Sequence, residues 1–320
     1  MMYGRGKGRV GIWGDYMKST WFANGLSLVT LGLLLAACGG GGVDSTPGPT
    51  PTPTPAPVPA SPKMTDALSA DIEFATVGTA LSGMSEASLY ALGNGPRISY
   101  KVTGDRVTLS YETVGMVVEP LNPVGSPGKP FAQDVSVGAG LSPSEVGFKA
   151  RVPNVQGVSL SYMRYGLIED GRQRSMNPNA PFAFSFFFGL PTATSAMPKS
   201  GTATYNTALE GGIISDSQYA MNGASQFSAN FSAGTLTTQI EAKGQGLLDA
   251  SKLINLGTFG GTGNIAGGGP KFSGTFSDGG VTYGNFDGAF FGPDAQEMGY
   301  HFVIEKDGAR AIGNVAGARR

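Results

Sequence analysis

The sequence predicts an all-β protein. Glycine accounts for 51 of the 320 residues, aromatic residues make up 10% and charged residues only 14%. Apolar and polar residues alternate in short runs that end at Gly, Pro or Asn, which is the pattern of strands joined by tight turns. Glycine supplies positive-φ turn positions and aromatic side chains fill a thin core, so this composition favours many short strands.

A first β segment is expected between Ile72 and about Leu190. Two short stretches in or near it, Asp66–Leu68 and Ser85–Leu92, indicate helical turns instead. The proline-containing stretch Glu119–Pro130 is expected to be an irregular loop, because proline cannot donate to a β ladder. The strands expected in this segment are Ile98–Val102, Arg106–Tyr111, Val158–Arg164 and Phe182–Phe188.

The segment after Leu190 alternates more regularly and predicts eight antiparallel strands, which close naturally into a small barrel. The clearest hairpin turns at Ser232–Gly234. Because the strands are shorter than the about 9 to 11 residues of a transmembrane strand and carry polar residues, the barrel is not expected to span a membrane. The expected strands are Thr202–Leu209, Gln226–Phe231, Thr235–Ala242, Thr258–Ile265, Lys271–Phe276, Tyr283–Phe291, Gly299–Glu305 and Ala311–Ala318.

The N-terminal region reads as a bacterial lipoprotein signal peptide over residues 1–37, whose start codon is either Met1 or Met17. A basic start at Lys18 precedes the apolar run Trp21–Leu35, and Leu35-Ala36-Ala37-Cys38 matches the lipobox. The alternative is a transmembrane anchor, but about 15 apolar residues are short for a bilayer of roughly 30 Å. We therefore expect lipidation at Cys38, and outer-membrane sorting because no aspartate follows the cysteine.

Residues 38–63 are expected to form a lipidated tether, rich first in glycine and then in proline. The alternating prolines from Pro47 to Pro59 favour extended polyproline II, which suits a stalk, although a plain flexible linker is an alternative. The remaining chain divides into a β domain over residues 64–195 and a barrel domain over residues 196–320.

Composition argues against several functional classes. The net charge of −1 gives no field that would attract nucleic acid. A single cysteine, Cys38, and a single histidine, His301, leave little for a metal site or for a nucleophile with its base. Adjacent acidic residues such as Glu169 and Asp170 are more typical of solvated turns than of acid/base catalysis. No enzyme activity, cofactor or metal is expected.

Several conspicuous motifs have a structural and a functional interpretation. His301 is expected to be a packed or solvent-facing imidazole, with haem ligation as the alternative. The Phe182–Phe188 run is expected to supply core on both sides of a buried strand, with an exposed aromatic patch as the alternative. The Gly260–Gly263 and Gly267–Gly269 clusters lack the following helix that a phosphate cradle needs. In the Phe291–Glu297 turn, Gly292 and Pro293 are expected to set backbone angles while Glu297 accepts local hydrogen bonds.

Two loops are the expected recognition sites, because long irregular loops on a rigid β scaffold commonly carry binding. They are Leu121–Phe131 and Asp170–Asn179. The predicted ligand-binding residues within them are Phe131, Arg172 and Arg174.

Four segments, in order, resemble the C-terminal barrel of the transferrin-binding protein B-like surface lipoproteins. Upstream, Leu160–Gly166 and Phe184–Gly189 are similar to the strands that end the preceding handle-like β domain of that family. The sequence departs from the family pattern at two positions. Thr207 replaces the usual glycine after the first strand, and Tyr300 stands where the family often has a second glycine. The four barrel segments are Met197–Asn206, Phe272–Phe276, Phe286–Pro293 and Glu297–Phe302.

The resemblance implies a small handle-like β domain followed by an eight-stranded barrel. It also implies a surface-exposed outer-membrane lipoprotein that captures a solute or macromolecule, above all an iron or haem source, and works with a TonB-dependent receptor. Export by a surface-lipoprotein translocator is implied as well. The alternative is a structural, adhesive or host-factor-binding surface lipoprotein with no role in nutrient uptake.

Overall fold

The computed structural model describes residues 62–82, 86–104, 106–111, 116–121, 128–137, 146–171 and 183–320. The expected signal peptide, Cys38 and nearly all of the tether lie outside the described residues, as do Arg172 and Arg174. Ser61–Arg320 form one compact unit. Among the described residues, no helix has the length and apolar character needed to cross a membrane.

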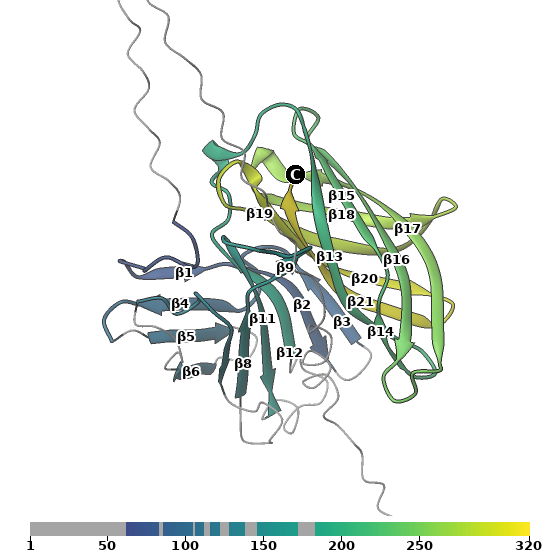
Figure 1. Cartoon of the computed structure of the whole chain (residues 1–320), viewed down its shortest axis with the longest axis horizontal. Helices are drawn as coiled ribbons and strands as arrows, with labels where there is room; N and C mark the ends of the chain where they lie inside the picture. Colours follow the sequence, from purple (N-terminus) through teal and green to yellow (C-terminus); the bar gives the residue numbers. More distant parts are fainter. Residues whose placement is uncertain are drawn as a thin grey trace, which may run out of the picture. The chain divides into compact units, whose positions relative to one another are not determined.

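The expected all-β fold is confirmed: the described part of the chain consists of strands, turns and short 3-10 segments. Its N-terminal part contains two larger sheets, coloured blue to teal in Figure 1. The four-stranded sheet has the order β1 (Ile72–Phe74), β4 (Arg97–Lys101), β5 (Arg106–Tyr111) and β6 (Met116–Leu121). The six-stranded sheet has the order β3 (Glu86–Tyr90), β2 (Thr76–Ser82), β12 (Ala183–Gly189), β11 (Met163–Asp170), β8 (Val146–Arg151) and β7 (Val135–Val137). A separate small hairpin pairs β9 (Asn154–Val155) with β10 (Val158–Ser159).

The phenylalanine-rich strand β12 lies in the middle of the six-stranded sheet. Because successive side chains of a strand point to opposite faces, Phe184, Phe186 and Phe188 share one face. They pack in one hydrophobic core with residues of the four-stranded sheet such as Ile98 and Leu109. The intervening Phe187 is also fully buried, on the opposite face. The expectation that this run supplies core on both sides is therefore confirmed.

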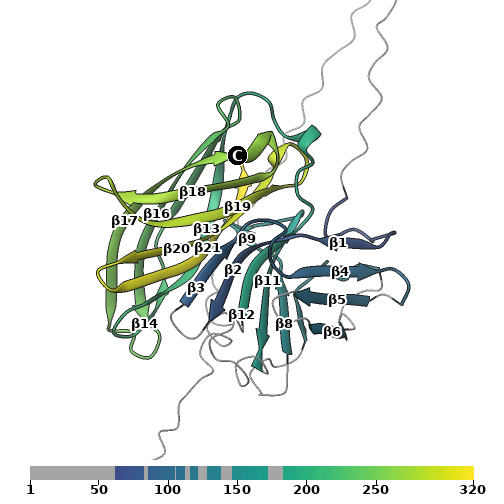
Figure 2. The ribbon, with the colours of Figure 1, turned by 180° about the vertical axis from the view of Figure 1, so that it is seen from behind.

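All eight expected barrel strands are present, and they close into a ring. Figures 1 and 2 show this ring in green and yellow from two sides. The last strand pairs antiparallel with the first, from Tyr205 opposite Arg319 to Ile214 opposite Arg310. The ring order is β13 (Thr202–Ile214), β15 (Ser225–Asn230), β16 (Thr235–Gly246), β17 (Leu253–Ile265), β18 (Lys271–Asp278), β19 (Val281–Phe291), β20 (Glu297–Lys306) and β21 (Ala309–Arg319).

One short strand, β14 (Gln218–Met221), was not expected. It pairs with the end of β13 and the end of β16, whereas β15 pairs with their other halves. Together β14 and β15 therefore fill a single place in the ring. The barrel is eight-stranded with one interrupted strand.

The barrel has an apolar interior and a polar exterior. Along β16, Leu236, Thr238 and Ile240 are buried, and the residues between them, such as Thr237 and Gln239, are exposed. A transmembrane barrel has the opposite arrangement, with an apolar band facing outward. The interior is filled largely by aromatic side chains, which include Tyr205, Phe227, Phe259, Phe272, Phe276, Phe286, Phe290, Tyr300 and Phe302.

The strands are longer than the sequence indicated. Strands β13 and β17 have 13 residues each, and β16 has 12. We expected each strand to end where Gly or a charged residue occurs, because these residues are depleted in strands. In the barrel they are tolerated, because the ladder continues on both sides. Strand length is therefore no reason to separate this barrel from a membrane barrel. The polar outer face is the observation that does so.

Five expectations for the first β segment were wrong. The expected strand Val158–Arg164 is divided between β10 and β11, and Glu169 and Asp170 are buried in β11 and are not solvated on a turn. Glu86–Tyr90 forms β3 and no helical turn, because pairing with β2 overrides its weak helical pattern. Asp66–Leu68 forms no helix. Asp66 is the last residue of a single turn, which its N–H closes by donating to the Lys63 carbonyl. The beginning of the expected loop Glu119–Pro130 belongs to β6, where Pro120 is tolerated because β6 is an edge strand whose register shifts at that point.

We expect Phe286→Ala to lower the free energy of unfolding by about 3–5 kcal/mol, because it opens a cavity in the barrel core. The Phe286 ring is fully buried, with its centroid 5.1 Å from that of Phe276 and 5.3 Å from that of Tyr300. The neighbouring exposed residue supplies the control: Asn285→Ala should change the value by no more than about 0.5 kcal/mol. Chemical denaturation measures both, and equal effects would contradict the assigned inward face.

Candidate functional site

The outer face of β20 is covered by the six-stranded sheet. Gly299 and His301 point outward from the barrel on this strand, opposite Tyr300 and Phe302 in the core. A Cβ atom at Gly299 would lie 2.6 Å from the Phe187 ring, so only glycine allows this close approach. We call this contact the joint; it is formed by Thr79, Tyr165 and Phe187 of the sheet together with Gly299 and His301 of β20.

His301 is a packed residue of the joint. Its side chain is 1% exposed, its Nδ1 lies 3.4 Å from Thr79 Oγ1, and its ring stacks on Tyr165 and contacts Phe187. Its Nε2 has no hydrogen-bond partner among the described residues. Burial lowers the pKa of His301 to about 3, so the imidazole stays neutral. The packed imidazole expected from the sequence is confirmed.

Glu297 ties the barrel to the chain that precedes β11. Its carboxylate accepts hydrogen bonds from the backbone N–H of Ser161, at 2.5 Å, and of Tyr162, at 2.9 Å. These partners are 136 and 135 residues away, so the expectation that Glu297 accepts local hydrogen bonds was wrong. Burial raises the pKa of Glu297 to about 7, and the N–H donors and the Arg164 charge offset only part of this shift.

The turn before Glu297 depends on glycine, as expected. Gly292 has φ 72°, and a Cβ atom there would lie 2.5 Å from the Tyr162 ring. Pro293 follows and begins the 3-10 segment Pro293–Ala295. The Gly292 carbonyl also accepts a hydrogen bond from Thr192 Oγ1 at 2.6 Å. The turn therefore holds both the linking segment and the Tyr162 ring against the barrel.

A buried arginine holds the end of one of the predicted recognition loops. Arg164 Nε donates to the Phe131 carbonyl at 2.8 Å, and its Nη1 donates to the carbonyls of Leu160 and Met163. Burial lowers the pKa of Arg164 to about 10, which leaves the guanidinium charged at neutral pH. The charges of Arg164 and Glu297 attract each other, and this attraction raises the pKa of Arg164 and lowers that of Glu297 against the larger effect of burial.

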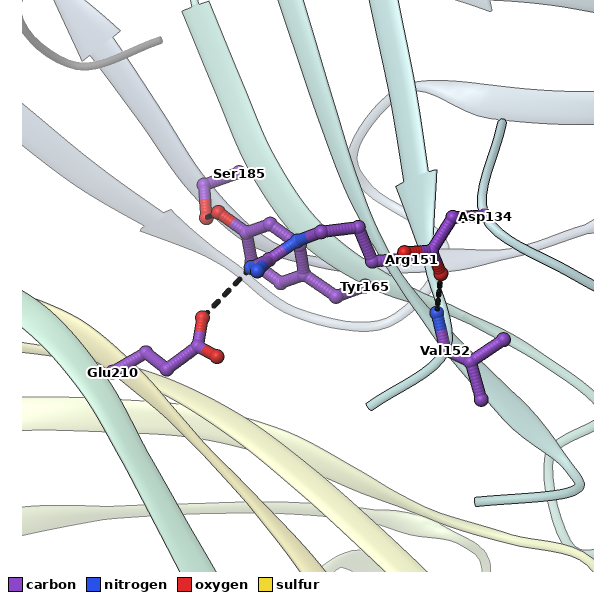
Figure 3. A network of polar contacts seen from close by, with 6 residues as sticks. All are labelled: Asp134, Arg151, Val152, Tyr165, Ser185 and Glu210. Carbon is purple, nitrogen blue, oxygen red and sulfur yellow. Dashed lines mark hydrogen bonds and ion pairs between the residues drawn. The ribbon is translucent and has the colours of Figure 1, made fainter. Parts of the chain in front are cut away.

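A second polar link joins the sheet to the barrel wall. Arg151 Nη2 of β8 lies 2.8 Å from Glu210 Oε2 of β13, and the guanidinium stacks over the Tyr165 ring at 4.8 Å (Figure 3). The Tyr165 hydroxyl in turn contacts Ser185 Oγ at 2.9 Å. Burial lowers the pKa of Arg151, but the nearby Glu210 charge contributes to a net rise. The pair is partly exposed, so it orients the two parts more than it stabilises them.

Of the three predicted ligand-binding residues, Phe131 alone lies among the residues that the structure describes. Phe131 is 1% exposed and packs edge-on against Phe74 and Phe188. Arg172 and Arg174 lie outside the described residues, but the chain enters their segment at Gly171, just after β11 ends. Phe131 is tied to Arg164 at the beginning of β11, roughly 20 Å from its end at 3.3 Å per residue. The binding role of all three residues stays a prediction.

Three connections leave the six-stranded sheet at one end. In register, Glu169 lies opposite Ala183 and Gly147, and Ala183 lies opposite Leu81. The described strand ends Leu81, Gly147, Glu169 and Ala183 therefore lie next to one another. We call this end of the sheet the loop end; the described chain stops here at Gly171, and Arg172 and Arg174 lie outside it.

The hairpin formed by β16 and β17 projects beyond the neighbouring strand β18, which was not expected from the sequence. Strand β17 pairs with β18 only from Gly260 onward, so its first seven residues extend beyond β18. At the tip, Leu248 and Leu253 are each 75% exposed. Two exposed leucines within a few residues are unusual for a polar barrel exterior. The signal was present in the sequence as the Leu247–Leu248 pair between two expected strands.

Comparison with known proteins identifies the barrel. Residues 197–320 match the family model described as the C-lobe and N-lobe β-barrels of transferrin-binding protein B. Residues 197–320 therefore form a barrel domain that is like those of transferrin-binding protein B. The expected resemblance is thereby confirmed, over the same part of the chain that carried the sequence motifs.

Solved structures of transferrin-binding protein B and related proteins are similar to the chain at low identity. A transferrin-binding protein B variant from Haemophilus parasuis is 16% identical over 77% of this chain and 45% of that chain, with a TM-score of 0.45. A structure described as a surface lipoprotein is 16% identical over 77% and 98%, with a TM-score of 0.35. The N-lobe of lactoferrin-binding protein B of Moraxella bovis is 14% identical over 55% and 80%, with a TM-score of 0.32. The chain spans less than half of the H. parasuis chain, and a search among curated proteins found no match.

Within the transferrin-binding protein B-type barrel, Glu297→Gln should change how stability depends on pH. The unfolded-state pKa of a glutamate is about 4.3, and burial raises the folded-state pKa of Glu297 to about 7. The folded state therefore binds this proton more tightly, and the free energy of unfolding falls as pH rises between these two values. Removing the group should remove a fall of roughly 4 kcal/mol.

The measurement is chemical denaturation between about pH 4 and pH 8, a range that brackets both pKa values. Asp294→Asn serves as the control, because its exposed carboxylate lies in the same turn. This control should keep the slope of the unmodified protein. Parallel profiles for Glu297→Gln and the unmodified protein would contradict the assignment.

Proposed function

We propose that the chain is an outer-membrane-anchored, surface-exposed lipoprotein that binds a solute or macromolecular ligand, above all an iron or haem source. The observation that carries the proposal is the transferrin-binding protein B-type barrel over residues 197–320. In this proposal the protein works beside a TonB-dependent receptor and reaches the surface through a lipoprotein translocator. The lipid on Cys38 attaches it to the membrane.

Binding at the outer surface suits the packed barrel better than enclosure of a small molecule. The barrel interior is occupied by a dense cluster of buried aromatic rings, such as Phe227, Phe272 and Phe290, with centroids 4.9 to 6.2 Å apart. A ligand therefore meets the loops and hairpin tips that this rigid scaffold presents. Such a surface matches a macromolecular ligand.

The barrel belongs to a type found in binding proteins, and we propose that the chain has no enzymatic activity. Among the described residues, no group of three or more His, Cys, Asp or Glu side chains could hold a metal ion. The one histidine is buried in the joint. Iron in this proposal is part of the ligand that is captured and is not a resident cofactor.

Two surfaces are proposed to contact the ligand. The first is the loop end of the six-stranded sheet, where Arg172 and Arg174 would recognise acidic groups. The second is the tip of the β16–β17 hairpin, where Leu248 and Leu253 would be covered on binding. Phe131 has a buried ring, so its contribution would be to hold the adjacent loop through Arg164.

Ligand capture is tested by offering haem, iron-loaded transferrin and iron- or haem-carrying proteins from growth medium to the immobilised chain. We expect at least one of them to bind. Arg172→Glu with Arg174→Glu should weaken that binding at least about tenfold, and Leu248→Asp with Leu253→Asp should weaken it similarly. The control pair Lys243→Glu with Lys252→Glu, at the projecting hairpin but on ion-paired residues, should have a smaller effect.

The outcomes separate the alternatives. If none of the iron or haem sources binds, the structural or adhesive interpretation replaces nutrient capture. If binding occurs and the arginine variants bind as the unmodified chain does, Arg172 and Arg174 are not contact residues. If the leucine variant binds with unchanged affinity, the hairpin tip is not a ligand-binding surface.

Lipid attachment at Cys38 has its own test. Mass spectrometry of the chain exported by a bacterial host should find residue 38 as the first residue, carrying a diacylglycerol on its thiol. Cys38→Ser should release the chain from the membrane fraction. An exported chain with an unmodified thiol at Cys38 would contradict the anchor without affecting the barrel.

A further inference from the structure

One end of the barrel carries exposed basic side chains. This end is where β13 begins and β21 finishes, and where the hairpins β15–β16, β17–β18 and β19–β20 turn; Figures 1 and 2 mark the C-terminus there. The exposed basic residues at this end, which we call the basic rim, are Lys199, Lys271, Arg319 and Arg320. The one exposed acidic side chain on the same loops is Asp294.

The charges of the basic rim are not neutralised by acidic side chains in the described part of the chain. Lys199 Nζ contacts the Thr194 carbonyl at 3.1 Å, and Arg319 Nη1 contacts the Asp294 backbone carbonyl at 2.8 Å. Arg320 Nε contacts the side-chain oxygen of Asn206 at 2.8 Å. These three partners are neutral, so none of them offsets the charge of the cation that it contacts.

The opposite end of the barrel has the opposite balance. Its basic residues lie in ion pairs, such as Lys243 with Glu241 and Arg310 with Glu305. Acidic side chains outnumber basic ones there: Asp216, Glu241, Asp249, Asp278, Glu305 and Asp307 against Lys243, Lys252, Lys306 and Arg310. The two ends are roughly 30 Å apart, given 13-residue strands tilted in a barrel. The barrel therefore has one basic end and one acidic end.

The chain enters the described unit beside the basic rim. The Met64 N–H donates to the Ser161 carbonyl at 2.7 Å, and the Ser161 N–H donates to Glu297 at the beginning of β20. The Arg319 N–H donates to the Gln296 carbonyl at 2.8 Å, one residue from Glu297. A short run of hydrogen bonds thus connects the chain entry to Arg319. The first described residues therefore lie at this end of the barrel.

We propose that the basic rim docks on the anionic surface of the membrane that holds the protein. The inference rests on the proposed lipid anchor, which places Cys38 in that membrane and 24 residues before the first described residue. A tether of this length permits many orientations, so an added attraction decides which end faces the bilayer. Docking of the basic rim directs the tip of the β16–β17 hairpin away from the membrane, toward a ligand.

The physics of the contact is that of basic groups near anionic lipid. The attraction acts within a Debye length, about 8 Å at physiological ionic strength. The acidic end lies well beyond that distance, so its repulsion is screened while the rim is in contact. Salt should weaken the contact, and neutral lipid should not support it.

The test measures vesicle binding by the chain from residue 38 onward with Cys38→Ser, which contains the whole compact unit and cannot be lipidated. The vesicles contain phosphatidylcholine with about 30% phosphatidylglycerol, or phosphatidylcholine alone. We expect flotation with the anionic vesicles at about 20 mM salt, loss of that binding at about 500 mM salt, and no flotation with neutral vesicles. Lys199→Glu, Lys271→Glu and Arg320→Glu combined should reduce the bound-to-free ratio at least about tenfold.

The matched control combines Lys243→Glu, Lys252→Glu and Arg310→Glu, which changes the net charge equally at the other end. It should bind the anionic vesicles as the unmodified chain does, and thermal melting confirms that both variants fold. The proposal is overturned if both variants lose vesicle binding equally, if the rim variant binds as the unmodified chain does, or if the unmodified chain does not bind. If the unmodified chain binds an acidic protein but no anionic vesicle, the rim is a protein-binding surface instead. Because lipidation and ligand capture are measured separately, a failure here leaves those results intact.

Discussion

Pairing between β13 and β21, the first and last strands of the barrel, is the interaction on which the rest of the structure depends. Ten consecutive residues of each strand are in register, from Tyr205 opposite Arg319 to Ile214 opposite Arg310. Closure pairs the two strands that would otherwise be the edges of the sheet, so their backbone donors and acceptors are satisfied along ten residues. It also encloses the aromatic core, which an open sheet would leave half exposed to water.

Closure also determines which side chains face outward from the barrel. Because Tyr300 and Phe302 must face the core, Gly299 and His301 face outward and receive the six-stranded sheet. The contact is specified by shape at Gly299, by a neutral buried imidazole at His301 and by two charged links, of which Glu297 is the more deeply buried. The loop end of the sheet, the hairpin tip and the basic rim are therefore held at defined places on one body, which is what recognition of a large ligand requires.

The barrel could be predicted from the sequence because alternation and turn glycines are local signals; the Ser232–Gly234 hairpin and the Phe182–Phe188 run needed no distant information. The wrong predictions concern residues whose structure depends on partners far away in the sequence. Glu86–Tyr90 becomes a strand through β2, and Glu297 accepts hydrogen bonds from residues more than 130 positions away. Charges collect at the rim only when the strand ends meet, so neither Lys199 nor Arg320 was conspicuous alone. The recognition residues Arg172 and Arg174 stay predictions.

Hydrogen exchange of the backbone amides tests closure most directly. The paired amides of β13 and β21 should exchange as slowly as those of the adjacent interior pairs β16–β17 and β19–β20, because all of them open only with the whole barrel. Rapid exchange along one side of β13 and β21, with slow exchange elsewhere in the ring, would show an open sheet with two edges. That result would contradict the closed barrel and, with it, the placement of the joint, the hairpin tip and the basic rim.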